Sequence, residues 1–228
     1  MARTDRVVTH GTFSIDGEDF EVDNNIWLYG DDHEVVVIDA AHEHEPIVAG
    51  IAGRRVVAIV CTHGHNDHIN AAVDLAAAVG APILLHPADT MLWDAVHPGR
   101  PVDGALSDGQ DIHVGASRLR VMHTPGHSPG GCCLYDDVAG ILFSGDTLFK
   151  GGPGATGRSF SSKDQILKSI SQRLLPLLPE TVVHTGHGDD TTLRAEAAGI
   201  LDELRHHVRG RDEPMAEVEP TAPDEPPA

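Results

Sequence analysis

Residues 61–70 read CTHGHNDHIN, which places His63, His65, Asp67 and His68 within six positions of one another. Imidazole nitrogens and carboxylate oxygens are ligands that proteins use for zinc, iron and manganese. In an extended segment His63 and His65 point to the same side, because they are two positions apart. Asp67 and His68 follow where the chain enters a helix, so their side chains take other directions. The segment therefore predicts ligands for two adjacent metal positions.

The flanks of this segment predict a strand before it and a helix after it. Residues 54–61, RRVVAIVC, form a β-branched run that is typical of a buried strand. Residues 66–80 predict a helix that ends at Gly80, a favourable residue after a helix C-terminus. The run APILLH at 81–86 predicts another buried strand, so the ligand-rich loop belongs to a βαβ-like unit.

The rest of the chain is rich in β-structure, with two further helices near its end. Strands are predicted at 24–30, 34–40, 117–123 and 131–136. A further strand within 140–149 stops at Gly145-Asp146, and a short one at the start of 180–188 runs into a loop. Apolar residues at helical spacing predict helices at 162–178, with Ser162 as the N-cap, and at 191–208. A glycine-rich loop at 151–159 separates the β-rich part from the first of these helices.

Composition narrows the range of partners and compartments. The chain carries 35 acidic and 16 basic side chains, a formal charge of −19, so nucleic acid and anionic membranes are not expected partners. The sequence has no apolar run of about 18 residues and no signal-peptide core at its start. Its three cysteines, two of them adjacent, do not suggest a disulfide framework. These features predict a cytoplasmic protein.

Three later motifs complete a resemblance to a known family. The segment THGHNDH at 62–68 matches the signature of the metallo-β-lactamase-fold hydrolases. TPGHSPG at 124–130 supplies His127, FSGDTLF at 143–149 supplies Asp146, and HTGHGDDTT at 184–192 supplies His187, in the family's order. The resemblance covers residues from about 20 to 208. It implies an α+β fold, a four-layer αββα sandwich, with the ligands on loops at one edge of the two sheets. We therefore expect a catalytic domain at 1–208 and an acidic, proline-rich disordered tail at 209–228.

The resemblance also implies a ligand set for two divalent metal ions, with zinc favoured and iron or manganese as alternatives. One ion is expected at His63, His65 and His127, and the other at Asp67, His68 and His187. Asp146 is expected to bridge the two beside a water or hydroxide, and Asp67 and Asp146 are the expected catalytic residues. Two neighbouring dications repel each other, so an anionic bridge is physically reasonable, and together they lower the pKa of a shared water.

Within the family, the glyoxalase II-like thioesterases are the most similar group. The expected reaction is attack of a metal-bridging hydroxide on the thioester of a low-molecular-weight thiol, whose thiolate can leave without a strong acid. Little of the chain follows residue 192, whereas glutathione-specific members carry a helical C-terminal domain. Only three of the 16 basic residues are lysine, which suggests a GC-rich genome. Mycothiol is therefore a candidate thiol. Lys150 and Arg158 are candidate substrate contacts.

Other functions of the same fold stay open. A persulfide dioxygenase would use a single iron, and a lactonase would share all seven ligands. A metallo-β-lactamase is less favoured, because those enzymes lack the bridging aspartate that Asp146 represents. A non-catalytic scaffold would be expected to have lost ligands, and all seven are present.

Overall fold

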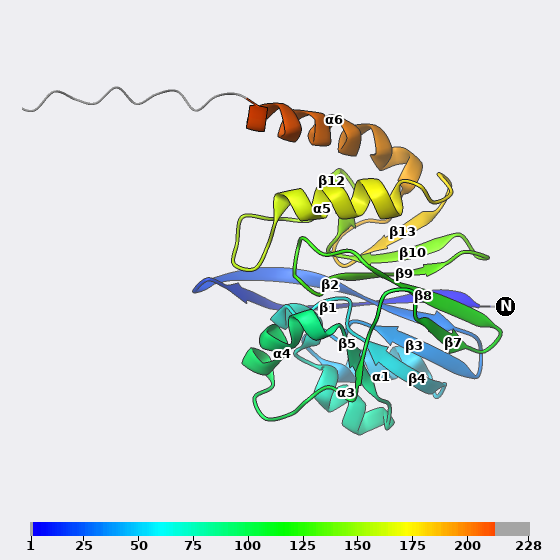
Figure 1. The fold of residues 1–228 in the computed structure, drawn as a ribbon. Coiled ribbons are helices and arrows are strands. Elements are labelled where there is room, and N and C mark those ends of the chain that lie inside the picture. The colour runs from blue at the N-terminus through cyan, green and yellow to red at the C-terminus, as the bar shows by residue number, and fades with distance from the viewer. Residues whose placement is uncertain (1, 213–228) are drawn as a thin grey trace, which may run out of the picture.

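The computed structural model describes residues 2–212 as two six-stranded β-sheets packed face to face, with helices on both outer faces (Figure 1). The first sheet has the order β1-β2-β3-β4-β5-β6, with β1 at Arg3–Ile15, β2 at Glu18–Gly30, β3 at Glu34–Ile38, β4 at Arg55–Val60, β5 at Ile83–Leu85 and β6 at Gly104–Ala105. The second has the order β14-β13-β10-β9-β8-β7, with β7 at Asp111–Val114, β8 at Ser117–His123, β9 at Cys132–Asp136, β10 at Ile141–Gly145, β13 at Val182–Thr185 and β14 at Thr191–Thr192. A two-stranded ribbon joins β11 (Leu148–Phe149) to β12 (Gly152–Pro153).

Helices cover the two outer faces. Figure 1 shows α1, α3 and α4 outside the first sheet and α5 and α6 outside the second. Their bounds are α1 His44–Ile51, α2 Asn66–Ile69, α3 Ala72–Val79, the short 3-10 helix η1 Pro87–Asp89, α4 Thr90–Val96, α5 Lys163–Ser169, the π-helix η2 Ile170–Leu174 and α6 Leu193–Asp212. The predicted α+β fold, a four-layer αββα sandwich, is confirmed.

Three apolar layers hold the four structural layers together. Along β2, alternate side chains point to opposite faces of the sheet. Ile26 and Leu28 pack under α1, α3 and α4, whereas Trp27 and Tyr29 pack between the sheets against Phe143 of β10. A third layer lies between the second sheet and α5 and α6. The second half of β2, residues 24–30, is therefore buried on both faces, which explains its apolar run at 26–29.

Parallel strand pairs bring the predicted ligands to one edge. Strands β3 and β4 are parallel, so the segments that follow them, at Asp39 and at His63, leave the sheet side by side. Strands β10 and β13 are also parallel, and they end just before Asp146 and His187. The long hairpin of β1 and β2 extends past the body of the molecule beside this edge (Figure 1).

Some boundaries differ from the prediction. The helix expected at 66–80 is two helices, α2 and α3, although Gly80 ends the second as predicted, with a left-handed φ of 68°. The last helix continues to Asp212, past the expected domain boundary at 208. Met1 and residues 213–228, which include most of the predicted tail, lie outside the described residues.

Two further features concern the cysteines and the helices. All three cysteines are buried and free. Among residues 2–212, no helix combines the length and the apolar character needed to cross a bilayer.

Candidate metal centre

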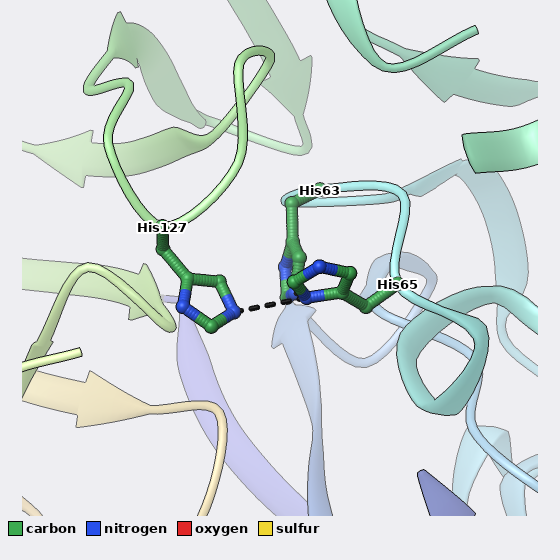
Figure 2. A group of neighbouring side chains, drawn as sticks. All are labelled: His63, His65 and His127. Carbon is green, nitrogen blue, oxygen red and sulfur yellow. Dashed lines mark hydrogen bonds between the residues drawn. The ribbon is translucent and has the colours of Figure 1, made fainter. Parts of the chain in front are cut away.

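Three predicted ligands meet in a first cluster, which Figure 2 shows. His63 and His65 lie on the loop after β4, and His127 lies on the loop between β8 and β9. The Nδ1 atom of His65 is 3.1 Å from His63 Nε2 and 2.9 Å from His127 Nε2 (Figure 2). Nitrogens that are bound to a tetrahedral zinc at 2.0–2.1 Å lie about 3.3 Å from one another. The three rings are therefore arranged at nearly the spacing of a bound ion.

Three further predicted ligands form a second cluster beside the first. The Nε2 atom of His187 is 3.1 Å from His68 Nε2 and 3.3 Å from Asp67 Oδ2. Asp67 and His68 are almost completely buried in α2, and His187 comes from the loop after β13. One helix turn and one distant loop thus supply the second set.

Asp146 lies between the two clusters. Its Oδ2 atom is 3.5 Å from His127 Nε2 and 3.5 Å from His187 Nε2, and its Oδ1 atom is 3.4 Å from His68 Nε2. It follows Gly145, whose φ of 48° turns the chain sharply at the end of β10. A Cβ atom at Gly145 would lie 2.4 Å from Thr62 Oγ1, so this turn packs directly on the first ligand loop.

Backbone carbonyls fix the orientation of two of the rings. The Nδ1 atom of His127 is 2.8 Å from the carbonyl oxygen of Ala155, and that of His187 is 2.7 Å from the carbonyl oxygen of Asp23. A carbonyl can only accept, so Nδ1 of each ring is the donor. In the neutral rings, Nε2 therefore directs a lone pair at the centre, as metal-binding histidines do.

Asp39 fixes two more rings, one directly and one through Thr62. It accepts hydrogen bonds from His68 Nδ1 at 2.9 Å and from the backbone amide and hydroxyl of Thr62 at 2.7 and 2.9 Å. Because the Thr62 hydroxyl donates to Asp39, its oxygen accepts from His63 Nδ1, 3.0 Å away. The backbone of Asp39 is left-handed, with a φ of 60°, a strained conformation held by these contacts.

The two clusters differ in protonation in the metal-free protein. Burial, aided by His127, lowers the pKa of His65 to about 3, and burial also lowers the pKa of His63. Burial acts to lower the pKa of His187 too, but Asp146 and Asp67 outweigh it and hold that pKa at about 10. The pKa of His68 is raised well above its ordinary value, since its carboxylate neighbours outweigh burial. His63 and His65 of the first cluster are therefore neutral at pH 7, whereas the second cluster carries imidazolium.

The donor set fits divalent cations. In the first cluster, imidazole nitrogens face one another across about 3 Å, an arrangement that a cation stabilises. Asp67 Oδ1 and Asp146 Oδ1 are buried oxygens that make no hydrogen bond within residues 2–212. Burying a carboxylate oxygen without a donor is costly unless a cation compensates it. Nitrogen and oxygen ligands of this kind match zinc, iron and manganese.

The two candidate substrate contacts lie in different surroundings. Lys150 Nζ is 2.9 Å from Asp189 Oδ2, and the Lys150 side chain is largely exposed. Phe149, the residue before it, packs against His187 with ring centroids 6.2 Å apart. Arg158 instead contacts the tip of the β1–β2 hairpin, where it pairs with Glu18.

Sequence reasoning missed a hydrogen-bonded pair behind Asp67. Asn24, fully buried in β2, has its Nδ2 atom 3.0 Å from Asp67 Oδ2, and its Oδ1 atom is 2.8 Å from His42 Nε2. The ring of His42 is packed beneath β1, where a Cβ atom at Gly11 would lie 2.2 Å from its Nδ1.

Comparisons with known proteins agree with this geometry. The model of the Metallo-beta-lactamase superfamily matches residues 20–187. The probable metallo-hydrolase YqgX of Bacillus subtilis is 32% identical over 187 residues, which cover 76% of this chain and 88% of that protein. A hydroxyacylglutathione hydrolase of Acidiphilium cryptum is 35% identical over 182 residues, which cover 79% of this chain and 70% of that protein. The crystal structure of TTHA1623 in a di-iron-bound form has 35% identity and a TM-score of 0.70, over 77% of this chain and 93% of that one.

Proposed function

The chain belongs to the metallo-beta-lactamase superfamily, and from this premise we propose that it is a two-metal hydrolase that cleaves the thioester of a low-molecular-weight thiol. The observation that carries the proposal is the position of Asp146, whose carboxylate is within 3.5 Å of rings in both clusters. A carboxylate can give one oxygen to each of two neighbouring cations.

The proposed ligand assignment follows the two clusters. His63, His65 and His127 would hold one divalent ion, and Asp67, His68 and His187 the other, with Asp146 between them. Zinc is the favoured metal, and the di-iron form of TTHA1623 makes iron the first alternative. When bound, such ions supply Lewis acidity, which activates water and polarises a carbonyl oxygen.

The side chains have separate roles in the proposed reaction. Asn24 donates to Asp67 Oδ2 at 3.0 Å and so fixes the carboxylate that would accept a proton from the attacking water. Asp39 fixes His68 through Nδ1, so that its Nε2 stays directed at the centre. The leaving thiol has a pKa of about 8.5 and departs as thiolate, so the reaction needs no side-chain acid at the sulfur.

The similarity to a hydroxyacylglutathione hydrolase supports a thioester as the substrate class. Lys150 is the more favourable of the two candidate contacts, because Phe149 beside it already packs against His187. Arg158 is a candidate at the hairpin tip, where its guanidinium lies 5.6 Å from the centroid of the Phe20 ring. The thiol carrier is proposed to be glutathione or mycothiol, and a direct comparison of the two thioesters decides between them.

One panel of assays tests the proposal. Zinc-loaded and iron-loaded protein would be given S-lactoylglutathione, the matching mycothiol thioester, a lactone and a β-lactam, and oxygen uptake would be followed with a persulfide. We expect thioester hydrolysis to dominate and to disappear in His127→Ala. Oxygen uptake with a persulfide and no thioester hydrolysis would instead identify a dioxygenase, and a lactone as the preferred substrate would identify a lactonase.

A further inference from the structure

A buried carboxylate outside the predicted ligand set joins the two loops of the first cluster. Asp89 ends η1 and is 0% exposed. Its Oδ2 atom accepts hydrogen bonds from the Gly64 amide at 2.9 Å and from the Ser128 hydroxyl at 2.7 Å. Its Oδ1 atom accepts from the Gly130 amide at 2.5 Å. Three donors from two loops therefore converge on one side chain.

Each donor is adjacent to a predicted ligand or within three residues of one. Gly64 lies between His63 and His65, and Ser128 follows His127 directly. The carboxylate thus connects two ligand loops that are 62 positions apart in the chain but only 2.9 Å apart at His65 and His127. Moving Asp89 would move both loops relative to each other.

The packing around Asp89 leaves no room for adjustment. A Cβ atom at Gly64 would lie 2.8 Å from Leu92 Cβ and 3.1 Å from Asp89 Cβ. A Cβ atom at Gly130 would lie 2.7 Å from Asp89 Cγ. Both glycines are therefore required for the loops to approach the carboxylate closely.

The site calls for a carboxylate and not for an amide. These three hydrogen bonds compensate the burial of the Asp89 carboxylate. An asparagine has one acceptor oxygen and one donor NH2 group. In either orientation its NH2 group would face an N–H or O–H donor, and at least one of the bonds between the loops would be lost.

We propose that Asp89 is a positioning residue that fixes the loop of His63 and His65 against the loop of His127, and so sets the affinity and geometry of the first metal position. The inference rests on the proposed metal centre. It adds a determinant that touches no ligand directly and acts through backbone amides and the Ser128 hydroxyl.

The test uses cobalt(II), because its visible absorption reports coordination geometry. Full-length protein would carry His187→Ala, which leaves only the three-histidine cluster with all its ligands. In that background Asp89→Asn, Ser128→Ala and the control Asp94→Asn would be stripped of metal and titrated with Co2+. Asp94 is an exposed residue of α4, so its substitution makes the same charge change away from the loops.

We expect Asp89→Asn to weaken Co2+ binding by about 10- to 100-fold and to change the absorption bands. Ser128→Ala removes one of the three hydrogen bonds and should shift both readouts in the same direction by less. Asp94→Asn should match the parent.

If Asp89→Asn does not fold, Ser128→Ala decides the question. The inference would be overturned if Asp89→Asn kept the affinity and spectrum of the parent. If Asp89→Asn is unfolded, the same result in Ser128→Ala would overturn it. Either outcome would leave the metal centre intact. Failure of the unsubstituted protein to bind Co2+ would refute the metal centre and this inference with it.

Discussion

The Nδ1 atom of His65 lies 2.9 Å from the Nε2 atom of His127, with the two ring planes 88° apart. The Nδ1 atom of His127 donates to a backbone carbonyl, so its Nε2 offers a lone pair to the centre. Burial keeps the pKa of His65 at about 3, so its ring is neutral at pH 7. The contact therefore brings two ring nitrogens together in the arrangement that a bound cation would stabilise.

Metal removal is expected to destabilise the fold. An ion at a thousand times its dissociation constant stabilises the native state by about 4 kcal/mol. For a chain of this size, that corresponds to a melting temperature about 10 °C higher. Thermal unfolding with and without EDTA measures the shift, and added zinc should restore it. His127→Ala should show a smaller EDTA effect; an unchanged melting temperature in the unsubstituted protein would argue against a resident metal.

Metal binding to the second cluster should depend on pH more strongly than binding to the first. The pKa of His187 is held at about 10 and that of His68 is raised, so the second cluster is protonated at pH 7 in the metal-free protein. An incoming ion must displace these protons, and its affinity therefore rises as the pH rises toward 10. His63 and His65 are already neutral at pH 7, so the first cluster releases no protons from them.

Calorimetry in buffers of different ionisation enthalpy measures this proton release. We expect the ion at the second cluster to release more protons than the ion at the first. His187→Ala, which disables the second cluster, should bind one ion with little release. Equal release for both ions would contradict the assignment of protonation states.

The pair of Asn24 and His42 should tune the second metal position. Asn24→Ala removes the donor to Asp67 Oδ2 and should weaken binding of the second ion by about tenfold. His42→Ala acts one bond farther away and should have a smaller effect. His33→Ala, at an exposed turn, is the control. Binding in Asn24→Ala that equals that of the His33 variant would rule out this role.

Lys150 should affect substrate binding more than turnover. Its ion pair with Asp189 is exposed and contributes little to stability. Lys150→Ala should therefore fold normally and raise KM for a thioester of an anionic thiol several-fold, with kcat nearly unchanged. Lys168, exposed on α5, gives the matched control. A fall in kcat without a change in KM would assign Lys150 a different role.

The sequence predicted the features that local patterns of residues determine, namely the ligand motifs and a helix N-cap. The seven proposed ligands were found because their types and spacings are specific, and Ser162 caps its helix as predicted, accepting from the Gln165 amide at 3.4 Å. The β1 strand was missed, since its polar residues mask the alternation. The signal that would have found it is Asp16-Gly17, a two-residue turn with φ of 53° and 78° that joins β1 to β2.

Residues that act through tertiary contacts left no local signal. The helix expected at 66–80 breaks near Asn70, whose Oδ1 accepts the His42 amide at 2.6 Å, and Ala71, whose amide bonds to the carbonyl of Ala40. Asp89 lies in the sequence Pro-Ala-Asp at 87–89, which matches no motif. Its hydrogen-bond partners come from loops that only the fold brings together. Spacing along the chain cannot reveal such contacts.

The most direct test of the central proposal is the metal content per chain, measured by elemental analysis on protein purified without added metal and after saturation. About two divalent ions per chain, reduced to about one in Asp146→Asn, is the expected result. The variant Asp137→Asn, at an exposed turn, should retain two. A single iron per chain with no second ion bound on titration, or two ions retained in Asp146→Asn with full thioester hydrolysis, would contradict a two-metal centre built around Asp146.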